Sequence, residues 1–392
     1  TELLRLQKNS VTSVDGINAE TFKRTPDSKV SDVFKRVSGI SVIDNKFVVV
    51  RGLNDRYNFA LLNGLPLPSS ESDKRSFSFD IFPSNMIDNL MVIKTASPDL
   101  PGEFAGGVID INTSEPKSDN TQVIQIGGSY NTITTFKNFK TYDGSKTDFL
   151  GFGVESRELP DIPATIDFSS LTRQDRSELA KLMDYSWSTK NKSALPNPSI
   201  QYTLSRNIKL SNDKTLSYIL TYNYQNNLSY SNIIRREFEE QVTGVVKKME
   251  LNDSVFMRSI LNSGMFNVTY RINRDNIIKF KNIYSVNSED KVNVRNGVRE
   301  LDNDPHQWEK STNFWYTQNN YLTNQIIGTH TIKQNKFNWN VGYSNVKRDI
   351  PNLRRVVYRK YSLNEDDPNE QYVAVIQQNG TIPTVAGNMF WS

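Results

Sequence analysis

Cysteine is absent from this chain of 392 residues, and the histidines are His306 and His330. Without cysteine there are no disulfides, thiolate nucleophiles or cysteine-ligated metals. Neither histidine belongs to an HExxH or HxH pattern, so a zinc site or a Ser-His-Asp triad has little support. We therefore expect a protein that is not an enzyme, with no catalytic residues, no metal and no cofactor.

Long apolar runs are missing as well. No stretch approaches the roughly 18 consecutive apolar residues of a membrane-spanning helix. The opening TELLRLQKNS lacks the apolar core of a signal peptide, so we expect that position 1 is not the start of the gene. Lys and Arg number 47 against 43 Asp and Glu, and this interspersed, nearly balanced charge of +4 predicts no nucleic-acid partner.

The sequence before Pro116 is typical of a small mixed α/β domain. A short helix is expected from Thr25, with Asp27 and Ser28 as capping candidates. Hairpins are expected around Asn45-Lys46 and Asn63-Gly64, the second being the strongest short hairpin signal. The stretch 84–90 looks helical, and strands MVIKTA and GGVIDINT should follow.

After Pro116 the apolar residues alternate with a period of two, which predicts β-strands. Opposite faces of these strands carry Ser, Thr, Asn, Lys and Arg, as at Thr221, Asn267 and Lys281. A soluble sandwich would also alternate, so alternation alone leaves both architectures open. The apolar positions that share a face are Ile200, Tyr202, Leu204, Ile208, Leu210, Leu216, Tyr218, Leu220, Tyr222, Tyr224, Phe266, Val268, Tyr270, Ile272, Ile278, Phe280, Tyr284, Val286, Phe337, Trp339, Val341 and Tyr343.

Connections between these strands differ in length at the two strand ends, and this asymmetry favours a transmembrane barrel with short periplasmic turns and long extracellular loops. The segment 147–198 interrupts the rhythm and contains the helix-like RQDRSELAKLMDYSW, so we interpret it as a large first extracellular excursion. The expected tight turns are 212–214, 274–276 and 333–336, and the expected long polar loops are 229–255, 290–309 and 349–372.

One set of motifs before Pro116 stands out: Arg51-Gly52, Arg56, Asn63-Gly64, Pro83, Ile93-Lys94, Gly102, Phe104 and Gly106 to Ile109. These motifs resemble the plug domain of TonB-dependent receptors, and the sequence is most similar to receptors of the Bacteroidetes type. The family pattern ends in YG-x-x-x-x-GGV-I-N-I-x-T, and here PGEFAGGVIDINT has Phe104 where Tyr-Gly is more usual and Asp110 before Ile111. The resemblance is strong over about residues 10–116 and weak beyond them.

This resemblance implies an α+β plug inside an antiparallel transmembrane β-barrel of about 22 strands. Alternation gives about eight to ten strands, so the chain should hold only part of that barrel. We expect residues 1–9 to be an N-terminal extension, 10–116 the plug domain and 117–392 the first part of the barrel with long extracellular loops.

The candidate site residues fall into three groups. Arg51 and Arg56 could pair with wall carboxylates and latch the plug, or be ordinary surface arginines. The turn positions Gly52, Asn63, Gly64, Gly102, Gly106 and Gly107 are interpreted as structural requirements. The run Ser69, Ser70, Glu71, Ser72, Asp73, Lys74 and Arg75 is either a ligand-facing plug apex or a solvated charge run.

The resemblance implies a TonB-dependent receptor in the outer membrane of a Gram-negative bacterium. Its plug would gate energised uptake of a siderophore, vitamin, glycan or peptide, with the TonB-ExbB-ExbD complex and outer-membrane lipids as partners. The alternative is a non-transporting binding or signalling scaffold that engages a surface lipoprotein. A secreted carbohydrate hydrolase is disfavoured, because Glu239-Glu240 and Asp366-Asp367 lack the required carboxylate geometry.

Overall fold

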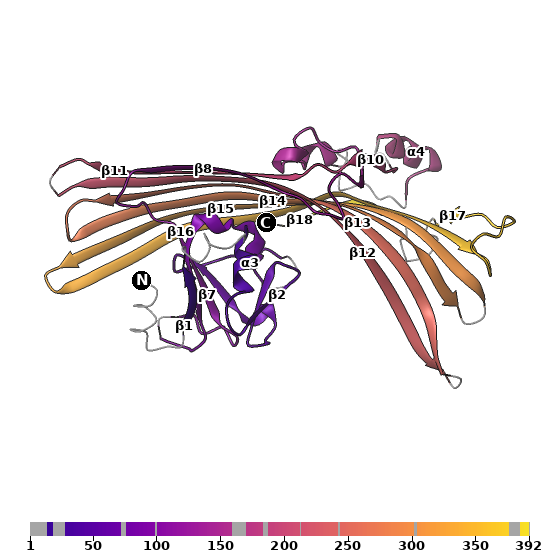
Figure 1. The fold of residues 1–392 in the computed structure, drawn as a ribbon, viewed down its shortest axis with the longest axis horizontal. Coiled ribbons are helices and arrows are strands. Elements are labelled where there is room, and N and C mark those ends of the chain that lie inside the picture. The colour runs from indigo at the N-terminus through magenta and orange to yellow at the C-terminus, as the bar shows by residue number, and fades with distance from the viewer. Residues whose placement is uncertain are drawn as a thin grey trace.

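The computed structural model has a small α/β domain packed against one face of a large, curved antiparallel sheet (Figure 1). The predicted extension 1–9, the capping candidate Asp27 and the segment 72–75 lie outside the residues that the structure describes. The described residues are 14–18, 28–71, 76–98, 100–158, 170–182, 187–211, 213–241, 244–301, 304–375 and 385–391.

The α/β domain contains a five-stranded sheet with the order β1-β6-β7-β4-β5, in which β4 and β7 are parallel. Both predicted hairpins are present, as β2–β3 and as β4–β5 around Asn63-Gly64. The helix α3 and the sheet enclose a core that includes Phe34, Phe82 and Ile109. The elements are β1 (Val14–Asn18), α3 (Val30–Phe34), β2 (Ile40–Ile43), β3 (Phe47–Val50), η1 (Asp55–Tyr57), β4 (Phe59–Leu62), β5 (Leu65–Pro66), η2 (Phe79–Ile81), η3 (Ser84–Met86), β6 (Ile87–Ile93) and β7 (Val108–Thr113).

Two local expectations are wrong in this domain. The N-cap of α3 is Lys29 rather than Ser28, and its side chain makes no capping hydrogen bond. The expected helix at 84–90 is one 3-10 turn followed by strand β6. The reason is tertiary: β6 pairs with β1 on one side and with β7 on the other, and this pairing overrides a weak local helix preference.

The large sheet has nine strands in the described part of the chain, in agreement with the eight to ten expected from alternation. Its order is β17-β16-β15-β14-β13-β12-β11-β8, and β18 also pairs with β16. The sheet is not closed into a barrel. Its strands are β8 (Thr121–Ser129), β11 (Asn197–Lys209), β12 (Thr215–Gln241), β13 (Gly244–Arg271), β14 (Asn276–Leu301), β15 (Asp304–Ile332), β16 (Asn335–Tyr361), β17 (Val373–Ala374) and β18 (Val385–Trp391).

The two faces of the large sheet differ as the alternation predicts. The inner face, which contacts the α/β domain, carries polar residues such as Thr221, Asn267 and Lys281, all buried. Between the tight turns and Tyr224 the outer face exposes apolar residues, and strand register places them side by side, as in Leu220 and Phe266. Exposed members of this outer band are Ile124, Ile126, Ile200, Ile208, Leu220, Tyr222, Phe266, Tyr284, Ile326, Phe337, Val341 and Tyr343.

Most of the polar stretches expected to be long loops are strand instead. Strands β12 to β16 are 26 to 29 residues long, whereas about 9–11 residues cross a membrane. Opposite charges pair across neighbouring strands in these stretches, as between Arg236 and Glu250 at 3.1 Å and between Arg295 and Asp253 at 2.6 Å. Cross-strand ion pairs stabilise strand pairing even where apolar residues do not alternate, so a polar composition does not by itself indicate a loop.

The described residues of the first excursion, 130–158, 170–182 and 187–196, lie on the outer face of the large sheet, opposite the α/β domain (Figure 1). The excursion begins directly after β8, earlier than the expected start at residue 147. It includes the predicted helix, α4 (Arg173–Leu182), and the hairpin of β9 (Asn138–Thr141) with β10 (Lys190–Ser193). Two 3-10 turns, η4 (Asp148–Leu150) and η5 (Glu155–Arg157), complete it. Among the described residues, no helix is long and apolar enough to cross a membrane.

Candidate functional site

The candidate site is the interface between the α/β domain and the inner face of the large sheet. Its apolar centre is small. Tyr321 of β15 packs edge-on against Phe82 at 5.1 Å and Phe77 at 6.1 Å between ring centroids. Ile219 and Ile283 of the sheet belong to the same buried cluster. Around this centre the interface is polar.

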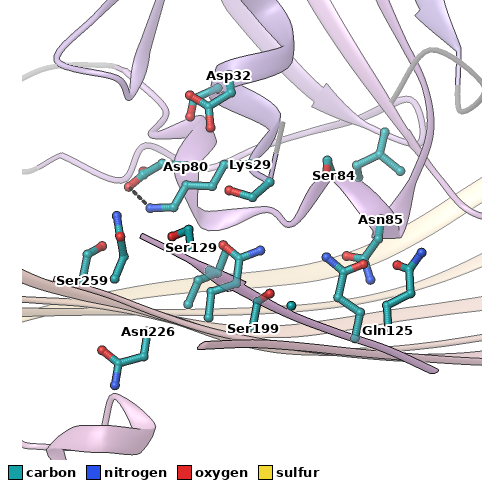
Figure 2. A pocket seen from close by; sticks show the side chains of 18 of the residues that line it. Lys29, Asp32, Asp80, Ser84, Asn85, Gln125, Ser129, Ser199, Asn226 and Ser259 are labelled. Atoms are coloured by element: carbon teal, nitrogen blue, oxygen red, sulfur yellow. Dashed lines mark ion pairs between the residues drawn. The ribbon is translucent and has the colours of Figure 1, made fainter. Parts of the chain in front are cut away.

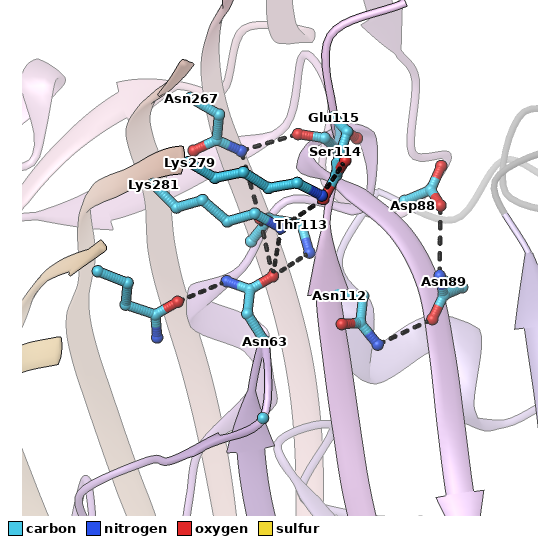
Figure 3. Close-up of polar contacts among 12 residues, drawn as sticks. Asn63, Asp88, Asn89, Asn112, Thr113, Ser114, Glu115, Asn267, Lys279 and Lys281 are labelled. Atoms are coloured by element: carbon cyan, nitrogen blue, oxygen red, sulfur yellow. Dashed lines mark hydrogen bonds and ion pairs between the residues drawn. The ribbon is translucent and has the colours of Figure 1, made fainter. Parts of the chain in front are cut away.

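Asn63, in the turn between β4 and β5, joins the two parts of the chain (Figure 3). Its side-chain oxygen accepts hydrogen bonds from the backbone N–H and the hydroxyl of Thr113, both at 3.0 Å, and from Lys281 Nζ at 3.0 Å. Its amide nitrogen donates to Gln325 Oε1 at 2.8 Å. Asn340 Nδ2 donates to the Asn63 carbonyl at 2.9 Å. Three strands, β14, β15 and β16, therefore hold this turn.

Glu115 extends the same network beyond β7 (Figure 3). Its carboxylate pairs with Lys279 at 2.7 Å and with Lys281 at 3.2 Å. Burial alone would raise the pKa of Glu115, but Lys281 and Lys279 lower it below its ordinary value. Asn267 Nδ2 donates to Thr113 Oγ1 at 3.2 Å. Because the two lysines lower its pKa, the Glu115 carboxylate is held in its charged form at the interface.

Asp80 is the most buried carboxylate of the interface on the α/β side. It accepts from Ser78 Oγ at 2.5 Å and from Asn287 Nδ2 of β14 at 2.7 Å, and Lys29 Nζ lies at 3.7 Å. Burial opposes ionisation, yet Lys29 and Lys46 together lower the pKa of Asp80 below its ordinary value. Lys46 itself pairs with Glu289 of β14 at 2.9 Å.

A polar cavity of about 1290 Å³ lies between α3, η3 and the inner faces of β8, β11 and β13 (Figure 2). Lys29, Asp32 and Asp80 approach it from the α/β domain. Gln125, Ser199 and Ser259 line the sheet side. The lining suits a hydrophilic solute, because hydroxyl, amide and charged groups can exchange bonds with it. In the described part of the chain, no group of three or more His, Asp or Glu side chains could hold a metal ion.

Arg51 and Arg56 lie on the exposed surface of the α/β domain. Arg51 has a positive φ of 57° and its guanidinium donates to the Lys94 carbonyl. Arg56 donates to the Tyr57 hydroxyl at 2.8 Å, with Cζ 4.8 Å from the centre of that ring. These contacts stay within the α/β domain, so a latch to a barrel wall remains a prediction.

The predicted turn positions show two kinds of requirement. Gly64 has a φ of +82°, which allows the Asn63-Gly64 hairpin turn to close. A Cβ at Gly106 would lie 2.1 Å from Asn58 Oδ1, so a side chain would displace that residue. Gly52 also has a positive φ, and a Cβ at Gly107 would lie 3.2 Å from the Ile93 carbonyl. At Gly102 the structure shows neither a positive φ nor a close neighbour.

The predicted apex is described only in part. Ser69 Oγ and Ser70 Oγ accept hydrogen bonds from the backbone N–H groups of Ser76 and Ser78, at 3.2 and 2.7 Å. Glu71 forms an ion pair with Arg348 of β16. Residues Ser72, Asp73, Lys74 and Arg75 lie outside the described residues, so a ligand-facing role remains a prediction.

Sequence analysis missed Asp80, Gln325 and the pairing of Glu71 with Arg348. The signal that could have pointed to Gln325 is its place on the polar face of an alternating strand, the same signal that marked Lys281. Asp80 carries the one charge in the largely apolar run FSFDIFP, and a lone carboxylate there is expected to need a buried partner.

Comparison with protein families matches residues 7–109 to the TonB-dependent receptor plug domain. Comparison with curated protein sequences finds no significant match.

Among solved structures, a mutant ferric enterobactin receptor (PfeA) from Pseudomonas aeruginosa is similar at 9% identity, over 94% of this chain and 59% of that one, with a TM-score of 0.40. The ferric citrate transporter FecA is similar at 11% identity over 92% and 64%, with a TM-score of 0.34. The siderophore receptor PirA from Acinetobacter baumannii is similar at 10% identity over 91% and 61%, with a TM-score of 0.34.

The chain thus spans less than two thirds of the length of these three proteins. Their TM-scores are below 0.5, so the assignment of the family depends on the plug match and on the fold. The α/β domain is a TonB-dependent receptor plug domain, and the chain consists of this plug followed by part of an antiparallel barrel-type sheet.

Proposed function

We propose that the protein of which this chain is a part is an outer-membrane active transporter, in which the plug domain gates the passage and the TonB-ExbB-ExbD complex supplies the force. The observation that supports this most is the polar character of the interface between plug and sheet. Asn63, Glu115 and Asp80 each make direct polar contacts to the inner face.

A polar interface suits a plug that must move. An intramolecular hydrogen bond contributes only about 1 kcal/mol net, because water replaces the partner when the bond opens. Buried apolar surface has no such replacement, and it costs about 25 cal/mol per Å² when exposed. An interface of amides, hydroxyls and ion pairs can therefore open stepwise as water or solute enters, while the small cluster around Tyr321 fixes the resting position.

The cavity beside the plug supports a hydrophilic cargo. Its lining contains both signs of charge, from Lys29 and Asp32, together with the amide of Gln125. We propose that this cavity is part of the route opened when the plug rearranges. A siderophore, vitamin, glycan or peptide would fit this chemistry, and the residues do not select among them.

The outer face supports a location in the outer membrane. Exposed Ile126, Leu220 and Val341 belong to an apolar band that would be unfavourable in water and favourable against lipid. We propose residues 10–116 as the plug and 117–392 as wall, with outer-membrane lipids as the surroundings of the band. Arg51 and Arg56 are proposed to latch the plug to carboxylates of the wall, and Ser69 to Arg75 to face the ligand.

The direct test is cargo accumulation in cells with and without the energising complex. The proposal expects uptake to fall to the level of passive leakage when TonB is deleted, while ligand binding to cells persists. Uptake that is unchanged by the deletion would contradict it. Binding without any accumulation in either strain would instead favour a scaffold that engages a surface lipoprotein.

A further inference from the structure

The first excursion is attached to the outer face of the large sheet by several independent contacts. The Tyr224 hydroxyl donates to the Phe149 carbonyl at 2.5 Å, and Asn262 Nδ2 donates to the Leu150 carbonyl at 3.1 Å. Gly153 N–H donates to Gln318 Oε1 at 3.1 Å. Tyr224, Asn262 and Gln318 all have outer-face register, so the excursion covers the outside of the wall and not its mouth.

A buried charged cluster fixes the excursion in this position. Arg157 donates to the two carboxylate oxygens of Asp148 at 2.5 and 2.7 Å, and lies 3.3 Å from Asp290 of β14. Its guanidinium stacks on Tyr316 of β15, 4.1 Å from the ring centre. Beside it, an apolar cluster combines Phe139, Tyr142 and Ala194 of the excursion with Phe256, Val292 and Phe314 of the sheet.

The excursion begins one membrane thickness away from the tight turns. Tyr224 lies about ten residues along β12 from the turn that precedes Thr215, and Asn262 lies about ten residues along β13 from Arg271. Between these limits the outer face carries the exposed apolar band. A transmembrane β-strand needs about 9–11 residues, so the lower edge of the excursion falls at the expected boundary between lipid and water.

At this edge the excursion exposes apolar side chains of its own. Phe149, whose carbonyl accepts from Tyr224, is 52% exposed, and Phe152 is 37% exposed. Tyr130 follows β8 directly, continuing the outer-face series of Ile124 and Ile126. Aromatic side chains of this kind concentrate where membrane meets water. Other exposed apolar side chains of the excursion lie farther from the tight turns, since the Tyr230 N–H on β12 donates to Thr134 Oγ1; they are Ile133, Phe136 and Leu195.

We propose that the first excursion is an interfacial collar, whose apolar edge inserts into the outer leaflet at the level of the lipid headgroups. Three observations combine: the attachment to the outer face, the distance of one membrane span from the tight turns, and continuity with the apolar band. The occupant of this surface is lipid. The inference depends on the proposed outer-membrane location, because the collar has lipid to contact only if the band does.

This chain contains no cysteine, so once any cysteine elsewhere in the full-length protein is replaced by serine, each introduced cysteine carries the only spin label. The full-length protein is labelled at F149C, F152C, L220C or E178C and reconstituted into phosphatidylcholine–phosphatidylglycerol nanodiscs. Collision rates with oxygen, which concentrates in lipid, and with a water-soluble nickel chelate are compared. Leu220, midway between the tight turn and Tyr224, reports on the apolar band, and exposed Glu178 on α4 reports on water.

The collar predicts that the ratio of oxygen to nickel collisions at positions 149 and 152 falls between the ratio at 220 and that at 178. Ratios at 149 and 152 equal to that at 178, with 220 in lipid, would overturn the collar and leave the transporter proposal intact. A water-like ratio at 220 as well would overturn both.

Discussion

At Asn63 a single side chain joins the plug to the wall, and its chemistry explains why asparagine suits this position. The residue has a φ of +51°, which asparagine tolerates better than most side chains, and its amide accepts from Lys281 while it donates to Gln325. Alanine would add backbone strain to the loss of these bonds. Glycine would remove the bonds alone.

We therefore expect Asn63→Gly to destabilise the plug–wall interface by about 1–3 kcal/mol, because Lys281 and Gln325 lose buried partners. Asn63→Ala should cost about 1 kcal/mol more, from strain at positive φ. The urea concentration at which half of the plug is released from the wall, measured in detergent, reports the destabilisation caused by each substitution. An Asn63→Gly protein as stable as the parent would show that the turn does not hold the interface.

The interface should also weaken in acid. The pKa values of Asp80 and Glu115 are lowered in the folded state, so their contribution is present above the ordinary values of 3.8 and 4.5 and is lost as pH falls through the lower folded values. The pKa of buried Asp110 is raised, which acts in the opposite direction.

A decrease of the urea midpoint below about pH 4.5 is therefore expected, and it should be smaller in an Asp80→Asn, Glu115→Gln double variant. Near-ultraviolet circular dichroism at pH 3 to 6 follows this transition. An equal decrease in parent and variant would assign the acid effect to other groups.

At the scale of elements, the sequence predicts the turns and strand faces that depend on residues close together in the chain. The hairpin at Asn63-Gly64 follows from turn chemistry, and the two faces of β11 to β14 follow from a period of two. It does not predict β6 in place of a helix, or the length of β12 and β13, because these depend on pairing with distant strands. The ion pair between Glu71 and Arg348 is equally distant in sequence.

The attachment of the excursion to the sheet should depend on Arg157, which pairs with Asp148 of the excursion and with Asp290 of β14. Arg157→Met leaves Asp148 and Asp290 as buried carboxylates without their cation, which costs about 3–5 kcal/mol for such a pair. We expect rapid proteolytic cleavage within 130–196 while the strands stay resistant.

The matched control is Arg173→Met, on the exposed surface of α4, which should leave the cleavage rate unchanged. Mass spectrometry of the fragments after limited treatment with endoproteinase Glu-C distinguishes the two, because neither substitution alters a Glu-C cleavage site. Equal resistance of the Arg157→Met protein would mean that the apolar cluster of Phe139 and Phe256 suffices to hold the excursion.

For the whole molecule, the wall separates two environments. The inner face presents polar groups to the plug and to a cavity of about 1290 Å³, and the outer face presents an apolar band below the collar. A plug held mainly by polar contacts inside such a wall can rearrange under force without unfolding the wall, whose strands are joined by continuous ladders. In the proposed transporter, uptake would therefore require relative movement of plug and wall.

Covalent attachment of the plug to the wall tests this requirement most directly. Glu71 and Arg348 already pair across the interface, so E71C and R348C together can be joined by a short bismaleimide. The account predicts that the cross-linked receptor loses energised uptake at saturating cargo, whereas the same double variant with both cysteines capped by N-ethylmaleimide, and therefore with the same two substitutions, keeps it. Undiminished uptake by the fully cross-linked receptor would contradict the account.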